Sequence, residues 1–307
     1  MAGTPTAGPP GTGPGDAAAR TGVLRLVLGH PTGFIGACGV AVVLVIALFG
    51  PMLAQHGPYE LAGDPLTGPS STHWLGTDNL GRDLLSRIAV GLRMSLIVAL
   101  TATIIAAVVG GALGMLAGFI GGRTDRFVMR CWDVVLAFPD IILAIAITAV
   151  LGSGMWTAVL AIAAVGMPSF ARLARSATRT ERNLDYVLAD LVAGAGRVNI
   201  LLRSVLPNVA GPLVLFLMTS IPHAIILEAG LSYLGLSEQA PTPSLGAMIN
   251  TARNYLVETV WFEIVPIVAL FLVTVSVMLI GLRLSDALDP ARRYTRRAIR
   301  RGSGGTA

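Results

Sequence analysis

The sequence predicts an all-α membrane protein with six transmembrane helices, on the basis of its composition and its hydropathy pattern. Of the 307 residues, 54% are hydrophobic and only 13% are charged, and the mean hydropathy is +0.73. A soluble domain needs far more polar surface than this composition supplies. Apolar runs also recur along the chain, each long enough to cross the hydrocarbon core of a bilayer as a helix.

The chain begins with a low-complexity segment that leads to a first span. Residues 1–22 are rich in Gly, Pro, Thr and Ala, so they cannot bury a core and are predicted to be disordered. Residues 34–54 carry no charge, and at about 1.5 Å per residue they extend roughly 31 Å. Because no compact basic stretch precedes a short apolar run at the start, we expect a membrane helix and not a cleaved signal peptide.

Five further spans follow and divide the chain. They cover about 95–121, 127–151, 155–171, 209–231 and 262–282. The third and fourth spans are separated by Gly152-Ser153-Gly154. We therefore expect a first helix with an external loop in 23–94, a core of five transmembrane helices in 95–293 with a cytosolic loop at 180–208, and a basic cytosolic tail in 294–307.

The arginines predict the orientation. With a cytosolic N-terminus, 18 of the 22 basic residues lie in inside segments and 4 lie outside, namely Arg82, Arg87, Arg93 and Arg253. Cytosolic loops of membrane proteins carry the excess of basic residues. The sequence thus predicts a multi-pass protein of the plasma membrane with both termini in the cytosol.

Residue usage excludes or disfavours several kinds of site. All 22 basic residues are arginine, so a phosphate-binding loop of the GxxxxGK[ST] type has no lysine and the chain does not hydrolyse ATP by that route. Cys38 and Cys131 lie in apolar runs of different predicted helices, which gives no support to a disulfide. The four histidines are scattered without metal-ligand spacing. We expect no cofactor, metal or nucleic-acid partner of this chain.

Glycines in the second span form a close-packing face. Gly110, Gly114 and Gly118 recur every four residues, a spacing that lets another membrane helix approach closely. Packing within the bundle and packing against another subunit are both consistent with this pattern.

Two aspartates and a proline mark the third span. Asp133 and Asp140 lie seven residues apart, so two helical turns place them on one face, with Arg130 within pairing distance of Asp133. Pro139 should kink the span. Charges at this depth usually face a cavity or a partner. A bend beside a solute pathway and a buried ion pair with a packing kink explain the pattern equally well, and a proton relay explains it less well.

Polar residues also occur in the fifth span. Glu228 lies about twenty residues into that span and is expected near the external face. Together with Pro222 and His223 it could border an external gate. An interfacial residue at a helix end is the slightly favoured reading of Glu228.

The 180–208 loop carries the most specific pattern. Apolar residues recur with helical spacing on one face of 185–193, and Gly194 between two alanines permits a turn. A second short helix is predicted over 198–206, and Pro207 either ends it or begins the fifth span. An arginine-rich hairpin on the lipid surface is one reading. The small residues favour the other, a docking element for a soluble partner.

The stretch from Tyr186 to Asn208 resembles the EAA loop of bacterial ABC-importer permease subunits, in which a glycine lies well upstream of a proline. The resemblance implies that the short helix before the glycine docks into a groove on an ATPase. The implied docking residues are Tyr186, Leu188, Ala189, Asp190, Leu191, Gly194, Ala195 and Pro207. Two residues depart from the motif: Asp190 stands where alanine is usual, and Ser204 where histidine is common.

Further segments resemble the dipeptide, oligopeptide and nickel permease group. They are 73–87, 228–236, 241–246 and 286–290. The extended first signature is similar to that of the C-type permease of such systems, and the resemblance covers about 24–293.

The external loop and the chain's end carry two smaller patterns. In 55–93, Asp78, Arg82 and Asp83 can fix one another and the loop backbone. The loop either contacts a substrate-delivery protein or partner permease, or forms a self-packed cap over the spans. Asp289-Pro290 resembles a helix start, and the basic helix after it would lie along the anionic inner leaflet.

The resemblance implies a type I importer permease that is not itself an enzyme. It implies a homologous second permease, two cytosolic ATPases that bind ATP and Mg, an extracytoplasmic binding protein and a lipid environment. Di- or oligopeptides are the expected substrates, with nickel, glutathione or haem as alternatives. The pathway or gate candidates are Asp133, Pro139, Asp140, His223 and Glu228. A stand-alone secondary transporter fits less well, because such carriers usually spread polar residues over several spans.

Overall fold

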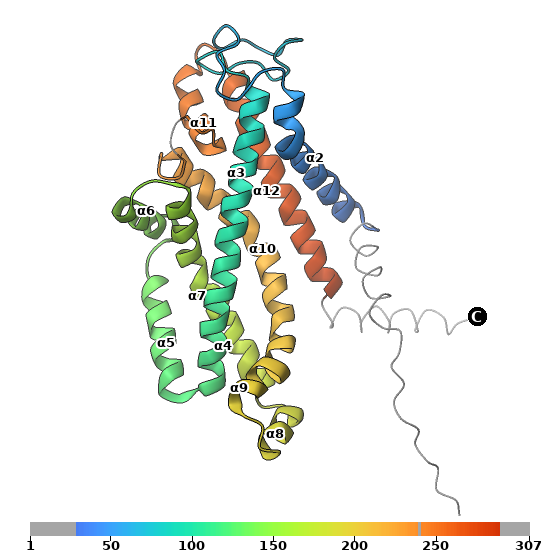
Figure 1. The fold of residues 1–307 in the computed structure, drawn as a ribbon, viewed down its shortest axis with the longest axis vertical. Helices are drawn as coiled ribbons and strands as arrows, with labels where there is room; N and C mark the ends of the chain where they lie inside the picture. Colours follow the sequence, from blue (N-terminus) through green and yellow to red (C-terminus); the bar gives the residue numbers. More distant parts are fainter. Residues whose placement is uncertain (1–28, 239–240, 289–307) are drawn as a thin grey trace, which may run out of the picture.

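The computed structural model describes residues 29–238 and 241–288, and in these ranges the chain forms helices and no β-strand. The predictions for residues 1–22, for Asp289-Pro290 and for the tail 294–307 lie outside the described residues. The long helices run roughly along one another and form an elongated bundle (Figure 1).

The helices follow one another with short connections, apart from residues 54–83. In chain order they are α2 (Pro31–Leu53), α3 (Leu84–Ile105), the π-helical turn η1 (Ala106–Gly110), α4 (Gly111–Ile120), α5 (Gly122–Val135), α6 (Asp140–Leu151), α7 (Met155–Glu181), α8 (Asp185–Val192), α9 (Arg197–Ile200), the π-helical turn η2 (Leu201–Val205), α10 (Leu206–Tyr233), α11 (Leu245–Ala252), the 3₁₀ turn η3 (Arg253–Tyr255) and α12 (Trp261–Leu288).

Five helical segments of the described chain are long and apolar enough to cross a membrane. They are Pro31–Leu53, Leu84–Ile120, Met155–Glu181, Arg197–Tyr233 and Trp261–Asp286. The pair α5 and α6 counts as a sixth span if its two helices are taken together. The predicted number of spans is therefore confirmed with that pair included, and the second and fourth spans extend further than the hydropathy pattern indicated.

The third span is broken, not merely kinked. α5 and α6 meet at an angle of 87°, with a turn between Val135 and Asp140. Pro139 cannot donate a backbone hydrogen bond and disfavours the helical conformation at Phe138, so the chain leaves one helix and starts another. The expectation that Asp133 and Asp140 share one helical face was wrong, since they belong to different helices.

The glycine face of the second span packs inside this subunit. A Cβ built on Gly110 or Gly114 would collide with the backbone carbonyl oxygens of Met167 and Ala171 on α7, and one on Gly118 would lie 2.8 Å from that of Arg175. The three glycines thus let α4 and the preceding η1 turn lie directly on α7. The structure decides for packing within the bundle.

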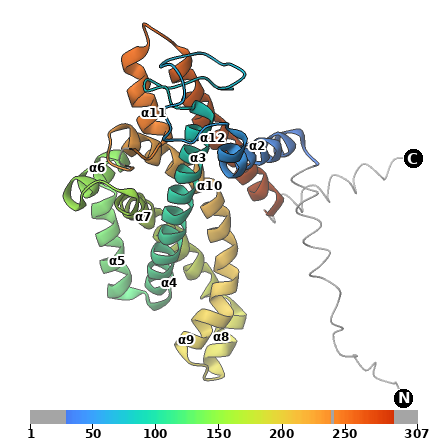
Figure 2. The same ribbon diagram turned by 45° about the horizontal axis from the view of Figure 1, so that its top comes forward.

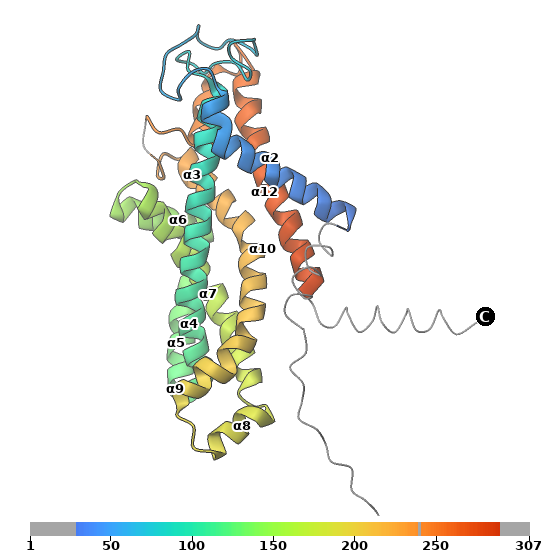
Figure 3. The same cartoon turned by 45° about the vertical axis from the view of Figure 1, so that its right-hand side comes forward.

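The core lies where α3, α7 and α10 meet. Small and branched side chains such as Ala99, Ala161 and Ile225 are fully buried there. α2 packs on the outside, lying obliquely across α12 (Figure 3), where Gly39 faces Ser276. Most of the long apolar side chains of α2 stay exposed, as expected for a helix surrounded by lipid.

The two ends of the bundle differ. Residues 54–83 and α11 cover one end, and we call these segments the cap. α8 and α9 project from the opposite end (Figure 2). The predicted external loop and the predicted docking loop therefore lie at opposite ends of the molecule, as six membrane crossings require.

Candidate functional site

The 180–208 loop folds as predicted into two short helices joined by a tight turn. α8 ends at Val192, and Gly194 follows with φ +80°. The amide of Ala195 donates to the carbonyl oxygen of Asp190 at 3.0 Å, and that of Gly194 to Leu191 at 3.1 Å. A left-handed residue with these two hydrogen bonds is the usual glycine end of a helix. Gly194 therefore sets the direction in which the chain leaves α8.

α8 is anchored to the bundle through one buried side chain. Val187 is fully buried, and it belongs to an apolar cluster that joins α8 to α4, α7 and the base of α10. The other buried members are Met115, Ala174, Ile200, Leu201, Val205 and Val209. Because α4, α7, α8, α9, η2 and α10 all contribute to this cluster, a force on α8 reaches the long helices directly.

Pro207 is the second residue of α10. The second short helix does not end there. α9, η2 and α10 run on as one helical segment over Arg197–Tyr233. Pro207 cannot donate the backbone hydrogen bond that the interior of an α-helix needs. It follows closely on η2, where the segment already departs from α-helical hydrogen bonding.

Hydrogen bonds tie α8 to η2 and to the start of α10. Ser204 Oγ donates to Asp190 Oδ2 at 2.6 Å. Tyr186 donates its hydroxyl to Glu181 Oε2 at 2.5 Å and accepts from Asn208 Nδ2 at 2.9 Å. The hydrogen bond to Glu181 raises the pKa of Tyr186. The two departures from the motif, Asp190 and Ser204, thus bond to each other.

The opposite face of α8 is apolar and uncovered. Leu188 and Leu191 are about half exposed, and Val192 is 91% exposed. Ala189 between them is also exposed. Three large apolar side chains on one short helix form a surface that a partner can cover. The sequence analysis placed the apolar residues of 185–193 on one face, and this was wrong for Val187, which faces inward while the others are exposed. The docking role of the exposed residues stays a prediction.

A second candidate site lies between the long helices. Asp140, the first residue of α6, lies 3.4 Å from His223 of α10, measured between Oδ2 and Nε2. Both side chains line a cavity of about 340 Å³ between α3, α6, α7 and α10. The structure thus brings together two of the five predicted pathway residues, which are 83 positions apart in the sequence.

Asp133 is not part of that cavity. Its Oδ1 accepts from Arg172 Nη2 of α7 at 2.7 Å, on an exposed surface. The predicted pair with Arg130 was therefore wrong, because α5 lies beside α7 and presents Asp133 to it. A second link of the same kind joins Asp125 of α5 to Arg175 of α7. The sequence did not reveal these interhelical pairs, since α7 was predicted to end at residue 171.

Glu228 is fully buried and not interfacial. Ser95 of α3 donates to its Oε2 at 2.6 Å, and Ser237 lies 3.4 Å from its Oε1. The favoured reading of an interfacial residue was wrong, because α3 covers this turn of α10. The expected position near the external face stays a prediction. Glu228 joins α3, α10 and the segment after α10, and it does not line the cavity beside His223.

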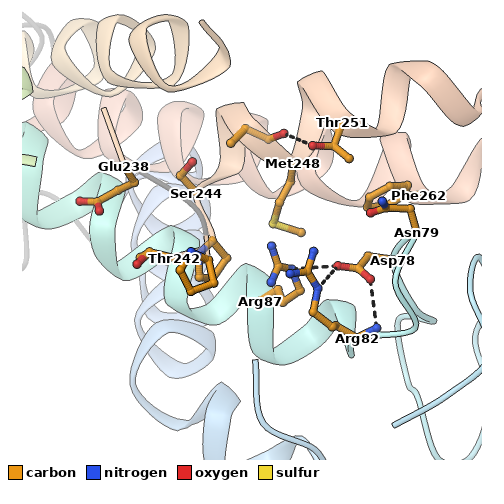
Figure 4. Close-up of a pocket in the computed structure, with 13 residues that line it drawn as sticks. Asp78, Asn79, Arg82, Arg87, Glu238, Thr242, Ser244, Met248, Thr251 and Phe262 are labelled. Atoms are coloured by element: carbon orange, nitrogen blue, oxygen red, sulfur yellow. Dashed lines mark hydrogen bonds and ion pairs between the residues drawn. The ribbon is translucent and has the colours of Figure 1, made fainter. Parts of the chain in front are cut away.

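The cap is organised around buried charges (Figure 4). Asp78 is 1% exposed and accepts from the amides of Leu80 and Arg82 at 2.8 and 3.0 Å and from Arg82 Nε at 2.7 Å. Arg87 Nε lies 3.2 Å from the same carboxylate. The predicted mutual fixing of Asp78 and Arg82 is confirmed.

The third predicted member, Asp83, has a separate role. Its Oδ2 accepts from the amide of Ser86 and so caps α3, while its Oδ1 lies 3.0 Å from His73 Nδ1. Glu238, on the far side of the small cavity shown in Figure 4, is partly buried, and this burial raises its pKa. The signature in 73–87 therefore specifies a self-packed cap whose charges point inward.

Comparison with known protein families gives one match. The family described as "Binding-protein-dependent transport system inner membrane component" matches residues 110–294. This range contains the 180–208 loop, α12 and all the residues that line the cavity except Thr103 and Ala106.

Curated proteins of known name are similar over most of the chain. The di/tripeptide transport system permease protein DppC of Pseudomonas aeruginosa is 41% identical over 271 residues, covering 85% of this chain and 89% of the relative. The glutathione transport system permease protein GsiD of Pectobacterium atrosepticum is 43% identical, covering 83% and 86%. The probable D,D-dipeptide transport system permease protein DdpC of Escherichia coli is 36% identical, covering 86% and 89%.

A solved structure shares the fold. A chain of the methionine ABC transporter MetNI in an inward-facing conformation superposes with a TM-score of 0.55 at 18% identity. The match covers 66% of this chain and 96% of the other. At this identity the likeness concerns the helical arrangement alone.

Proposed function

Because the chain belongs to the family of binding-protein-dependent transport system inner membrane components, we propose that it forms half of a membrane pathway for di- and oligopeptides in an ATP-driven importer. Its named relatives carry dipeptides, tripeptides or glutathione. Relatives at 36 to 43% identity over more than four fifths of the chain support a peptide substrate.

The proposed coupling mechanism rests on the two faces of α8. One face is rooted in the bundle through Val187, and the other presents Leu188, Leu191 and Val192 to the exterior. A partner ATPase that covers this apolar face can push α8. The buried cluster transmits that movement to α4, α7 and α10, because packed cores move as units. ATP and Mg bind to the ATPases, and this chain contributes no catalytic residue.

The remaining partners follow from the two ends of the molecule. With α8 in the cytosol, both termini are cytosolic and the cap is external. A second, homologous permease lies beside this chain and closes the pathway. A substrate-binding protein docks on the exposed apolar side chains of the cap, Tyr59, Leu61 and Trp74. Lipid covers the outer faces of α2 and α12. Of the predicted pathway residues, Pro139, Asp140 and His223 border the pathway.

A charge placed on α8 tests the docking surface. Ala189→Arg puts a guanidinium between the exposed leucines, so co-purification of the ATPases should fall. Val257→Arg is the matched control, since Val257 is fully exposed at the cap end. Equal co-purification of the two variants would favour a loop that lies on lipid.

A pair of glycine variants tests the turn. Gly194 has φ +80° and Gly196 has φ −64°, and both have open space around a would-be Cβ. Only Gly194→Leu meets backbone strain, of roughly 1–2 kcal/mol. Its ATP-driven peptide uptake should fall about 5- to 30-fold, while Gly196→Leu stays near wild type. Wild-type uptake by Gly194→Leu would refute the proposed coupling role.

Glutathione is the second candidate substrate, on the strength of the relative that is 43% identical. Competition between a labelled dipeptide and unlabelled glutathione for uptake by the assembled transporter separates the two candidates.

A further inference from the structure

The cavity between α3, α6, α7 and α10 brings polar side chains together among apolar walls. Its volume of about 340 Å³ lies at the lower end of the roughly 300–1,000 Å³ typical of ligand pockets. Four hydroxyl side chains line it together with Asp140 and His223. They are the exposed Ser169 and three hydroxyls bonded to helix backbone, Thr103, Thr219 and Ser220. Polar groups at membrane depth face a water-filled path or a partner, because exposing them to hydrocarbon is costly.

The three hydroxyls present lone pairs to the cavity. Thr103 donates its proton to the carbonyl oxygen of Ala99 at 2.7 Å. Thr219 and Ser220 both donate to that of Phe216, at 3.0 and 2.7 Å. A hydroxyl has one proton and two acceptor lone pairs. With their protons committed to the helix backbone, these three side chains offer a ligand only acceptors. The fourth hydroxyl, Ser169, can donate as well as accept.

One acidic side chain lines the cavity. Asp140 lies in the first turn of α6, where the helix terminus stabilises a negative charge. Its partner His223 lies 3.4 Å away, and both side chains are about half exposed. No other ionisable side chain lines this cavity in the described part of the chain. Among the described residues that line the cavity, Asp140 is therefore the one carboxylate that a cationic ligand would meet.

We propose that this cavity binds the free α-ammonium group of a peptide in transit. The ammonium displaces His223 from Asp140 and donates its remaining protons to Thr219 and Ser220. Ammonium–carboxylate hydrogen bonds are charge-assisted and stronger than those of a neutral donor. This inference rests on the proposed import function and adds the chemical group that the membrane domain recognises.

The walls of the cavity suit a peptide of variable sequence. Phe170 and Phe216 meet edge to face with ring centroids 4.8 Å apart, and both line the cavity. Apolar walls accept many side chains without directional bonds, while the acceptor group fixes the one feature that all unmodified peptides share. The cavity would therefore select a terminus and not a sequence.

Cysteine labelling in the assembled transporter, without binding protein or nucleotide, tests occupancy. Cys38 and Cys131 are the two free cysteines and are changed to serine. Ser220→Cys then places a thiol in the cavity, and Ile226→Cys, 56% exposed on the same helix, is the control outside it. N-ethylmaleimide should label Ser220→Cys, and the dipeptide Ala-Ala should slow that labelling but not that of Ile226→Cys. If Ser220→Cys is not labelled, the cavity is not accessible to water and the proposal is refuted. If Ala-Ala leaves the labelling rate unchanged, the peptide does not occupy the cavity and the proposal is also refuted.

Blocking the amine tests the chemical assignment. Ala-Ala should protect at a concentration at least about tenfold lower than N-acetyl-Ala-Ala, a difference of about 1.4 kcal/mol. Asp140→Asn should remove this difference, whereas His223→Gln should keep it, since it removes only the competing partner. Equal protection by both peptides would overturn the proposal. So would protection by Ni²⁺ with none by Ala-Ala, because that result assigns the cavity to a metal cation.

Two measurements distinguish failure of the cavity assignment from failure of the proposed import function. ATP-dependent uptake of Ala-Ala by the wild-type transporter tests import itself. If uptake is absent, the proposed function fails. If uptake is present and the amine preference is absent, only the cavity assignment fails. Unchanged co-purification of the ATPases with Asp140→Asn shows that a lost preference does not come from misassembly.

Discussion

Replacing Ser204 with alanine tests whether its hydrogen bond to Asp190 holds α8 against the base of α10. Ser204 Oγ lies 2.6 Å from Asp190 Oδ2, and the pair is partly buried. An intramolecular hydrogen bond contributes about 0.5–1.5 kcal/mol, and more when one partner is charged. Partial exposure places this one near 1 kcal/mol, which corresponds to a roughly fivefold larger population of released α8.

Hydrogen exchange of the α8 amides measures that population directly. Ser204→Ala should raise exchange in α8 about fivefold while leaving α7 unchanged. Peptide uptake should fall, and co-purification of the ATPases should stay at the wild-type level, because the exposed face of α8 is intact. Asn199→Ala, an exposed change on neighbouring α9, should alter neither quantity.

A double-mutant cycle with Asp190→Ala completes the test. The two changes should show a coupling energy of about 1 kcal/mol, since each removes the same hydrogen bond. Additive effects would refute the reasoning. Reduced co-purification with unchanged α8 exchange would also refute it, because the two side chains would then act by touching the ATPase.

Three further predictions concern the bundle and the cap. Gly114→Ala drives a methyl group into a carbonyl oxygen of α7 and should lower stability by about 1–3 kcal/mol. Gly111→Ala should not, because a Cβ there makes only ordinary van der Waals contacts. Thermal unfolding in detergent compares the two variants. Asp78→Ala leaves the buried Arg87 without its carboxylate and should lower stability by about 3–5 kcal/mol. The control Asp64→Ala, at an exposed position, should lower it by less than about 0.5 kcal/mol. Proteolysis of the cap compares the two variants. Glu228→Leu removes the acceptor of a buried serine and should cost about 1–3 kcal/mol, while Glu228→Gln keeps an acceptor and should melt near wild type.

Most of the fold was predictable because lipid imposes a simple rule on sequence. Each span needs a long apolar run, and such runs are visible without tertiary information. The 180–208 loop was predictable for a related reason. Its helices, its turn at Gly194 and its entry at Pro207 depend on local periodicity and on backbone constraints of single residues.

Contacts between distant segments were not predictable in this way. Asp133 was assigned to Arg130 because both lie on one helix, yet Arg172 lies closer in space. Glu228 was expected at an interface because the sequence shows its place along a helix but not that Ser95 of α3 covers it. The Asp140–His223 pair depends on the 87° break between α5 and α6, and a proline indicates where a helix bends but not which way.

The packing of Gly110, Gly114 and Gly118 against α7 has a consequence for biogenesis. This close-packing face is already occupied within one chain, so the second permease must use other surfaces. The helices around α7 can therefore assemble as soon as they leave the insertion machinery, before any partner is synthesised. We expect the isolated subunit to reach a folded, protease-resistant state in the bilayer. Assembly of the importer would then join two subunits that are already folded, and folding of this subunit would not depend on its partner.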